Sequence, residues 1–164
     1  MNYHELYHVA RVYNAILGSM NDSVLFNIVR EENSLCYSIG SYVTQYNPSL
    51  TVYAGINKNN YKKTVELIKK CVESMSDKKT LERLFDSAIK TINTFINTYY
   101  DDVSNQINNY YSGKYEYIED IEKYRESINS VTIDEVIELN KKIHLGTIYM
   151  LKGVQEWKRN LLLK

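Results

Sequence analysis

The chain has 164 residues, of which 44% are hydrophobic and 24% are charged, and its 20 basic and 20 acidic residues balance to a formal net charge of zero. With this balance, the chain has no overall positive field that would indicate nucleic acid or an anionic membrane as a partner. No apolar run reaches the roughly 20 residues of a membrane span, and the N-terminus shows no basic segment followed by an apolar one. We therefore expect a cytoplasmic protein that binds neither nucleic acid nor membrane.

The hydrophobic pattern predicts helices, then a hairpin, then helices again. Apolar residues at helical spacing predict a helix over residues 3–19 that Gly18 ends, and a second helix over residues 24–32. Alternating apolar and polar residues predict strands over residues 35–46 and 50–56, joined by a turn at residues 47–49. Further helices are predicted over residues 61–75, 80–100, 103–112, 117–129 and 133–143, the last of which begins with a capping box of Thr132 and Glu135.

The end of the chain adds one more predicted strand, at residues 147–151 between two glycines. The order of elements indicates an α+β fold in which one antiparallel sheet is covered by helices. Three strands make a thin sheet, and the chain starts in a helix, so we expect the first strand of the complete sheet to be missing. A single domain is predicted over residues 1–155, with a tail at residues 156–164.

Residues 4–8 spell the pattern H-E-x-x-H, which on a helix places two zinc ligands beside a glutamate that activates water. A helical wheel puts His4 and His8 opposite the apolar stripe of this helix, and too few residues precede them to supply a substrate-binding sheet. No third ligand is evident. We therefore predict that His4, Glu5 and His8 are solvated residues of a packing helix, and a self-contained H-E-x-x-H zinc peptidase is the least favoured hypothesis.

Five stretches of the sequence resemble one known family in the right order. They are Asn14 to Gly18 (NAILG), Ser23 to Phe26 (SVLF), Val29 to Ser38 (VREENSLCYS), Tyr53 to Asn57 (YAGIN) and Ser130 to Val136 (SVTIDEV). Together they resemble the C-terminal, non-catalytic domain of the insulinase and mitochondrial-processing-peptidase family of zinc metallopeptidases. The resemblance implies the half-unit fold of that family, and it spans nearly the whole chain.

In that family zinc is held by an inverted motif, H-x-x-E-H, which lies in the N-terminal domain. The present chain has Tyr7 where this motif needs glutamate, so the resemblance implies that zinc is bound by a missing or partner domain and not by this chain. We expect the chain alone to be inactive as a peptidase. Its expected partners are a catalytic domain, in the same or another chain, and a peptide substrate, with a dimer as an open alternative.

The resemblance also singles out Arg30 and Tyr37, which match an arginine and a tyrosine that reach into the catalytic chamber in many members. A guanidinium can donate to a peptide carbonyl or carboxylate, and a phenol can donate to an oxyanion. The alternative is structural: Arg30 pairs with Glu31, and Tyr37 is a half-buried strand residue. Ser34 replaces a glycine of the family pattern, at a position where we expect a turn with positive φ.

Two main hypotheses for the function follow from these observations. In the first, the chain closes over a zinc-bearing domain and helps to bind and position a peptide through Arg30 and Tyr37. In the second, it is a catalytically degenerate homologue that uses the same surface as a binding or assembly module.

Overall fold

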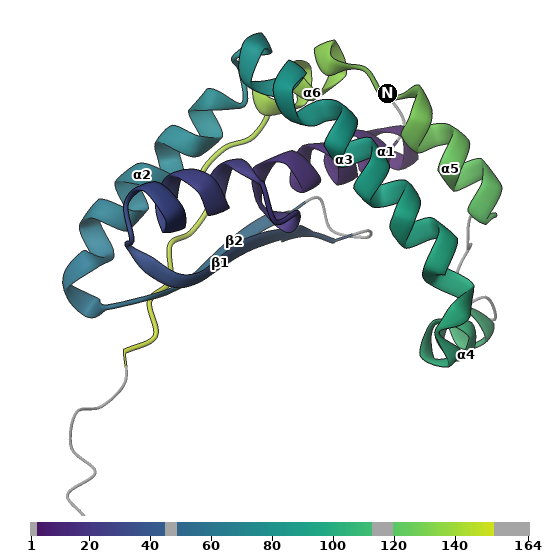
Figure 1. The fold of residues 1–164 in the computed structure, drawn as a ribbon, viewed down its shortest axis with the longest axis horizontal. Coiled ribbons are helices and arrows are strands. Elements are labelled where there is room, and N and C mark those ends of the chain that lie inside the picture. The colour runs from purple at the N-terminus through teal and green to yellow at the C-terminus, as the bar shows by residue number, and fades with distance from the viewer. Residues whose placement is uncertain (1–2, 45–48, 113–119, 153–164) are drawn as a thin grey trace, which may run out of the picture.

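A computed structural model describes residues 3–44, 49–112 and 120–152 (Figure 1). Its elements occur in the predicted order, with helices on both sides of one hairpin in the sequence. They are α1 (Tyr3–Asn14), η1 (Ala15–Ser19), η2 (Phe26–Glu32), β1 (Cys36–Val43), β2 (Leu50–Ile56), η3 (Lys58–Asn60), α2 (Tyr61–Ser74), α3 (Lys78–Thr98), η4 (Tyr99–Asp101), α4 (Val103–Ser112), α5 (Ile121–Ser130) and α6 (Ile133–Asn140). The fold is α+β, as the sequence predicts.

The first predicted helix is confirmed, but it changes its winding after Asn14. The apolar stripe of α1 continues through η1, a π-helix in which Ile16 and Leu17 are fully buried. The expected role of Gly18 as the helix stop is wrong, because the helix runs on to Ser19 and Met20 then becomes extended. Gly18 instead allows a close approach: a Cβ there would lie 2.5 Å from the Oγ atom of Ser41 in β1.

The predicted hairpin is confirmed as an antiparallel pair of β1 and β2. Side chains alternate along each strand, so that Ile39 and Val52 pack toward the core while Tyr42 and Tyr53 are exposed. The pairing has one irregularity, a β-bulge between Cys36 and Ser38 that leaves Tyr37 as the extra residue. Asn47 and Pro48 of the predicted turn lie outside the described residues.

The predicted third strand at residues 147–151 is wrong. In the part of the chain that the structure describes, the sheet has two strands, and residues 147–152 have no regular structure. Tyr149 and Leu151 are both 82% exposed. A β-strand is defined by hydrogen bonds to a neighbouring strand, and in the described ranges this segment pairs with neither β1 nor β2, even though its residue types favour a strand.

The helices cover one face of the hairpin, and α1 lies between the hairpin and the outer helices (Figure 1). Besides β1, α1 contacts α3, α5 and α6, so other elements cover it on more than one side. The predicted start of α6 is confirmed by its cap, since Thr132 and Glu135 form a capping box. Helix α3 begins at Lys78, two residues before the predicted start, and Asp77 caps it by accepting a hydrogen bond from the Thr80 N–H. Within the described ranges, no helix combines the length and apolar content needed to cross a bilayer.

Candidate functional site

A tight turn at Ser34 joins the helix that carries Arg30 to the strand that follows. Ser34 has a φ of 50°, and it is the one non-glycine residue with positive φ in the described part of the chain. Its N–H donates to the Arg30 carbonyl at 3.0 Å, and the N–H of Leu35 donates to the Val29 carbonyl at 3.1 Å. These bonds end η2 in the manner of a left-handed helix cap. The expectation that this position needs positive φ is therefore confirmed.

Arg30 presents its guanidinium beside an aromatic ring. Its Cζ atom lies 4.7 Å from the centre of the Phe26 ring, a cation–π contact along one face of η2. The Nε atom is 3.8 Å from an Oε atom of Glu31, and both side chains are about half exposed. An exposed ion pair of this length contributes little, about 0–1 kcal/mol at most. The structural alternative for Arg30 is thus present, but it leaves the guanidinium open to a competing acceptor.

Tyr37 lies on the outer face of the hairpin, away from the helices. Because the β-bulge makes it an extra residue in β1, its ring can lie over Gly55 of β2, where a Cβ would be 2.2 Å from the Tyr37 Cζ atom. The side chain is nevertheless 77% exposed, so the prediction of a half-buried strand aromatic does not describe it. The Tyr37 phenol is therefore exposed to solvent, while Gly55 of β2 lies against its ring.

A hollow of about 320 Å³ lies where η1 and η2 meet the hairpin. Arg30 and Phe26 line it from the helix, and Ser38 and Tyr53 line it from the two strands. Tyr37 is not among its lining residues. Arg30 thus lines the hollow, and Tyr37 is the neighbour in sequence of the lining residue Ser38. In the described structure, the two predicted site residues do not contact each other directly.

The wall of this hollow is fixed by a buried contact between η1 and β1. The Ser41 hydroxyl donates to the Oδ1 atom of Asn14 at 2.8 Å, and both side chains are buried. Gly18 packs against the same serine, with a would-be Cβ only 3.0 Å from its backbone nitrogen. Because buried polar groups without partners are costly, this hydrogen bond holds the helix end in register with the strand.

Tyr53 is the lining residue that the sequence reasoning missed. Its ring lies over Gly40 of β1, and its centre is 6.4 Å from that of Tyr42. Tyr53 and Gly55 alternate along β2 opposite Gly40 and Ser38, and a glycine inside a strand often marks the close approach of another group. That pairing of glycines with tyrosines could have identified the exposed face before a structure was available.

The thiol nearest to Arg30 does not offer a nucleophile. Burial raises the pKa of Cys36, and the Arg30 guanidinium opposes that rise only in part. The thiol therefore stays protonated at neutral pH, whereas nucleophilic cysteines act as thiolates. The chemistry available at this site is donation of hydrogen bonds and positive charge to a bound group.

The expectation that His8 is solvated is wrong. His8 is 6% exposed, and its ring centre lies 5.4 Å from that of Tyr124 in α5. Arg11, one turn further along α1, donates from its Nε atom to the Tyr124 hydroxyl at 3.2 Å. The helical wheel assigned this side of α1 to water, but α5 packs against it. The side chains of His4 and Glu5 lie outside the described part of the structure.

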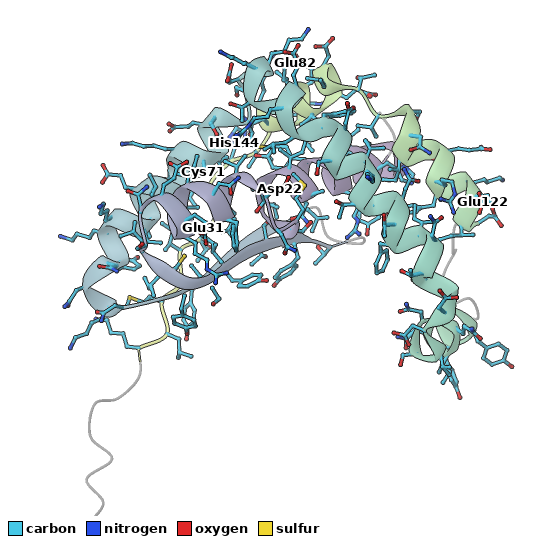
Figure 2. All side chains as sticks on the ribbon, in the orientation of Figure 1. Asp22, Glu31, Cys71, Glu82, Glu122 and His144 are labelled. Carbon is cyan, nitrogen blue, oxygen red and sulfur yellow. The ribbon has the colours of Figure 1, made fainter. Side chains whose placement is uncertain are left out.

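The described residues do not fit a zinc centre. A catalytic zinc site uses three protein ligands and an open position. Among the residues that the structure describes, no group of three or more His, Cys, Asp or Glu side chains could hold a metal ion. Figure 2 shows His144, Glu31, Glu82 and Glu122 on separate parts of the molecule. Of the three motif residues, His8 thus has a packing role in the described structure.

Comparison with known proteins places this geometry in a family. The family model described as the peptidase M16 inactive domain matches residues 2–92. A Bacillus subtilis (strain 168) protein named probable inactive metalloprotease YmfF is 27% identical over 150 residues, which cover 91% of this chain and 35% of that protein. Another protein of that organism, named uncharacterized zinc protease YmxG, is 35% identical over 74 residues, which cover 44% of this chain and 18% of that protein.

Solved structures agree with the sequence comparisons. A conserved protein from Enterococcus faecalis V583 has a TM-score of 0.72 and 26% identity, over 84% of this chain and 33% of that one. A peptidase M16 inactive domain from Pseudomonas fluorescens has a TM-score of 0.64 and 20% identity, over 85% of this chain and 34% of that one. The chain spans about a third of the length of both proteins, as it does of the first Bacillus relative. Because the family model covers more than half of the chain, this protein belongs to the peptidase M16 inactive-domain family.

Proposed function

We propose that this chain is a non-catalytic domain that closes over a zinc-bearing domain, in the same or another chain, and helps to bind and position a peptide substrate through Arg30 and Tyr37. The observation that carries this proposal is the hollow beside Arg30, which adjoins the strand segment holding the exposed Tyr37. Hydrolysis itself would belong to the zinc-bearing domain. This chain would supply a cationic donor and a phenol at fixed positions on one face.

Two further findings support the proposal. The chain spans about a third of the length of the first relative and of the first solved structure. The remaining two thirds of a protein of that length could include a domain that binds the metal. Tyr37 is 77% exposed without a packing role that needs its hydroxyl. A large, rigid aromatic side chain held open in this way suits contact with a partner or substrate.

The test is reconstitution with a zinc-bearing domain that carries H-x-x-E-H, followed by measurement of kcat/KM for an unstructured peptide. Arg30→Ala and Tyr37→Phe should each lower kcat/KM by about 100- to 1,000-fold, the range for loss of one preorganised donor to a transition state. The Phe variant keeps the ring over Gly55 and removes only the hydroxyl. Arg83→Ala, an exposed change on α3, is the matched control and should have no effect.

A second function remains supported by one observation. The relative that covers most of this chain is named a probable inactive metalloprotease. Under this alternative the domain binds a partner or peptide without assisting hydrolysis. An active reconstituted assembly in which Arg30→Ala and Tyr37→Phe leave turnover unchanged would refute the first proposal and favour the second.

A further inference from the structure

The hollow beside Arg30 has the chemistry of a site for an anionic group. Arg30 is its one charged lining residue, and the other polar lining groups include Ser38, Asn21 and the Tyr53 phenol. Among the described lining residues, none carries a carboxylate. The hydroxyl of Ser41 already donates to Asn14, so it is not available to a ligand. A surface of hydrogen-bond donors with one cation is complementary to a carboxylate.

Arg30 is also oriented for such a ligand. The contact with Phe26 at 4.7 Å holds one face of the guanidinium, which reduces the freedom that binding would otherwise remove. Arginine can bind a carboxylate through two parallel hydrogen bonds, a geometry that the single Nε contact to Glu31 at 3.8 Å does not use. Glu31 is therefore a weak competitor for the same cation, and its charge should reduce the affinity for an incoming carboxylate.

Tyr53 links the hollow to the exposed face of the hairpin. It is 54% exposed, lines the hollow, and shares the outer face with Tyr42 and Tyr37. From Tyr37 to Tyr42 this face extends about 17 Å, at roughly 3.3 Å for each residue of a strand. That length suits about five residues of an extended peptide, whose backbone and aliphatic groups can pack on the tyrosine rings. A small free anion would leave this surface uncovered.

We propose that the hollow binds the side-chain carboxylate of an acidic residue in an extended peptide, through Arg30, and that Tyr53 is a further substrate-positioning residue. This inference rests on the proposed function, since it names the class of peptide that the domain selects. It concerns binding to this chain alone, so it can be tested without a catalytic partner.

The experiment titrates the full 164-residue chain with three short peptides and follows binding by two-dimensional amide NMR. The first is acetyl-Ala-Ala-Glu-Ala-Ala-amide, whose side-chain carboxylate is its one negative group. The second carries Gln in place of Glu. The third carries Gln and a free C-terminal carboxylate. The Glu peptide should bind about fivefold more tightly than the Gln peptide, a modest preference for a charge-assisted contact at a partly exposed site.

Four variants of the chain assign this preference to residues. Arg30→Gln should abolish the difference between the Glu and Gln peptides, while Glu31→Gln should enlarge it because a competing charge is removed. Tyr53→Ala should weaken both peptides about equally and keep their ratio. Arg83→Ala is the matched control and should leave both affinities unchanged. All four positions lie at the surface, so each variant should fold, and its amide spectrum checks this.

Several results would overturn the inference. They are the absence of binding, equal binding of the Glu and Gln peptides, and a Glu preference that survives Arg30→Gln. Binding of the third peptide as tightly as the first would assign the site to a chain terminus and not to a side chain. Unchanged affinities in Tyr53→Ala would remove Tyr53 from the site. Failure of the proposed function would look different: the Glu preference would remain, while turnover in the reconstituted assembly would not respond to Arg30→Ala.

Discussion

Replacing Ser34 by glycine should stabilise the protein, although Ser34 makes the turn between the helix of Arg30 and the first strand. The φ of 50° at this position is a conformation that glycine adopts freely and that a side chain disfavours. The backbone bonds of Ser34 and Leu35 to the end of η2 need no side chain, so glycine keeps them. The substitution removes a conformational cost from the folded state without removing a contact on which the turn depends.

The expected gain is the difference between two effects. A non-glycine residue in the left-handed region costs about 1–2 kcal/mol. Glycine also has more conformational freedom in the unfolded chain, which lowers the free energy of unfolding by about 0.4–1 kcal/mol. With the middle of each range, the free energy of unfolding should rise by about 0.8 kcal/mol. This corresponds to a Tm increase of about 2–3 °C in a chain of this size.

Urea unfolding followed by far-ultraviolet circular dichroism measures this difference. Ser34→Ala is the first control: it removes the hydroxyl but keeps the Cβ, so it should give no gain. Ser104→Gly is the second, because Ser104 is an exposed residue in the first turn of α4, where glycine should cost about 0.5 kcal/mol. A destabilised Ser34→Gly variant, or an equal gain from Ser34→Ala, would refute the argument from backbone conformation.

Three further predictions concern the core. Tyr13→Phe should lower stability by about 1 kcal/mol, because the buried hydroxyl donates to the Oδ1 atom of Asn140 at 2.7 Å. Gly18→Ala should cost about 1–3 kcal/mol, since its Cβ would meet the backbone nitrogen of Ser41 at 3.0 Å. Burial, with a smaller contribution from Glu32, raises the pKa of Cys71 from 9.0 to about 12. The unfolded thiol ionises first, so this contribution to stability is complete below pH 9 and is lost between pH 9 and 12.

Each of these predictions has its own control. An unchanged urea midpoint in Tyr13→Phe would show that its hydrogen bond contributes nothing net. For Gly18→Ala, the cost should be smaller when it is measured in a Ser41→Gly background against Ser41→Gly alone, because the clash with the Ser41 Oγ atom at 2.5 Å is then absent. For Cys71, the variant Cys71→Ala should lose part of the alkaline decline in stability measured by urea unfolding between pH 8 and 10. An identical pH profile in both proteins would contradict the sign derived for Cys71.

The sequence predicted the elements wherever a local pattern was sufficient. Periodicity located the helices and the hairpin, and the resemblance to a family motif predicted the turn at Ser34. The errors share a different cause, which is the presence or absence of a distant partner. The wheel for α1 could not show that α5 packs over His8, and the residue types of 147–151 could not show that this segment pairs with neither strand of the described hairpin. Tyr53 was missed because its importance depends on cross-strand register.

The roles of the two site residues remain a prediction, and the structure describes their surroundings. Arg30 and Tyr37 were named from the family resemblance, and the structure places both at the hairpin side of the molecule, one in the hollow and one on the open face. The motif gave their spacing in sequence but not the bulge that turns Tyr37 outward. The contact of Arg30 with Phe26 was also not predicted, although residues four apart lie on the same side of a helix.

The two-stranded sheet has a consequence for how the isolated chain behaves. With two strands in the described sheet, β1 and β2 each leave one edge whose backbone groups are not bonded within the hairpin. Such edges attract other strands of almost any sequence, which makes self-association at high concentration a hazard. Main-chain pairing at these edges would bring affinity without selectivity. Selection of the correct partner strand must then depend on side chains. The bulge at Tyr37 also makes β1 less regular, which disfavours pairing with an unrelated strand.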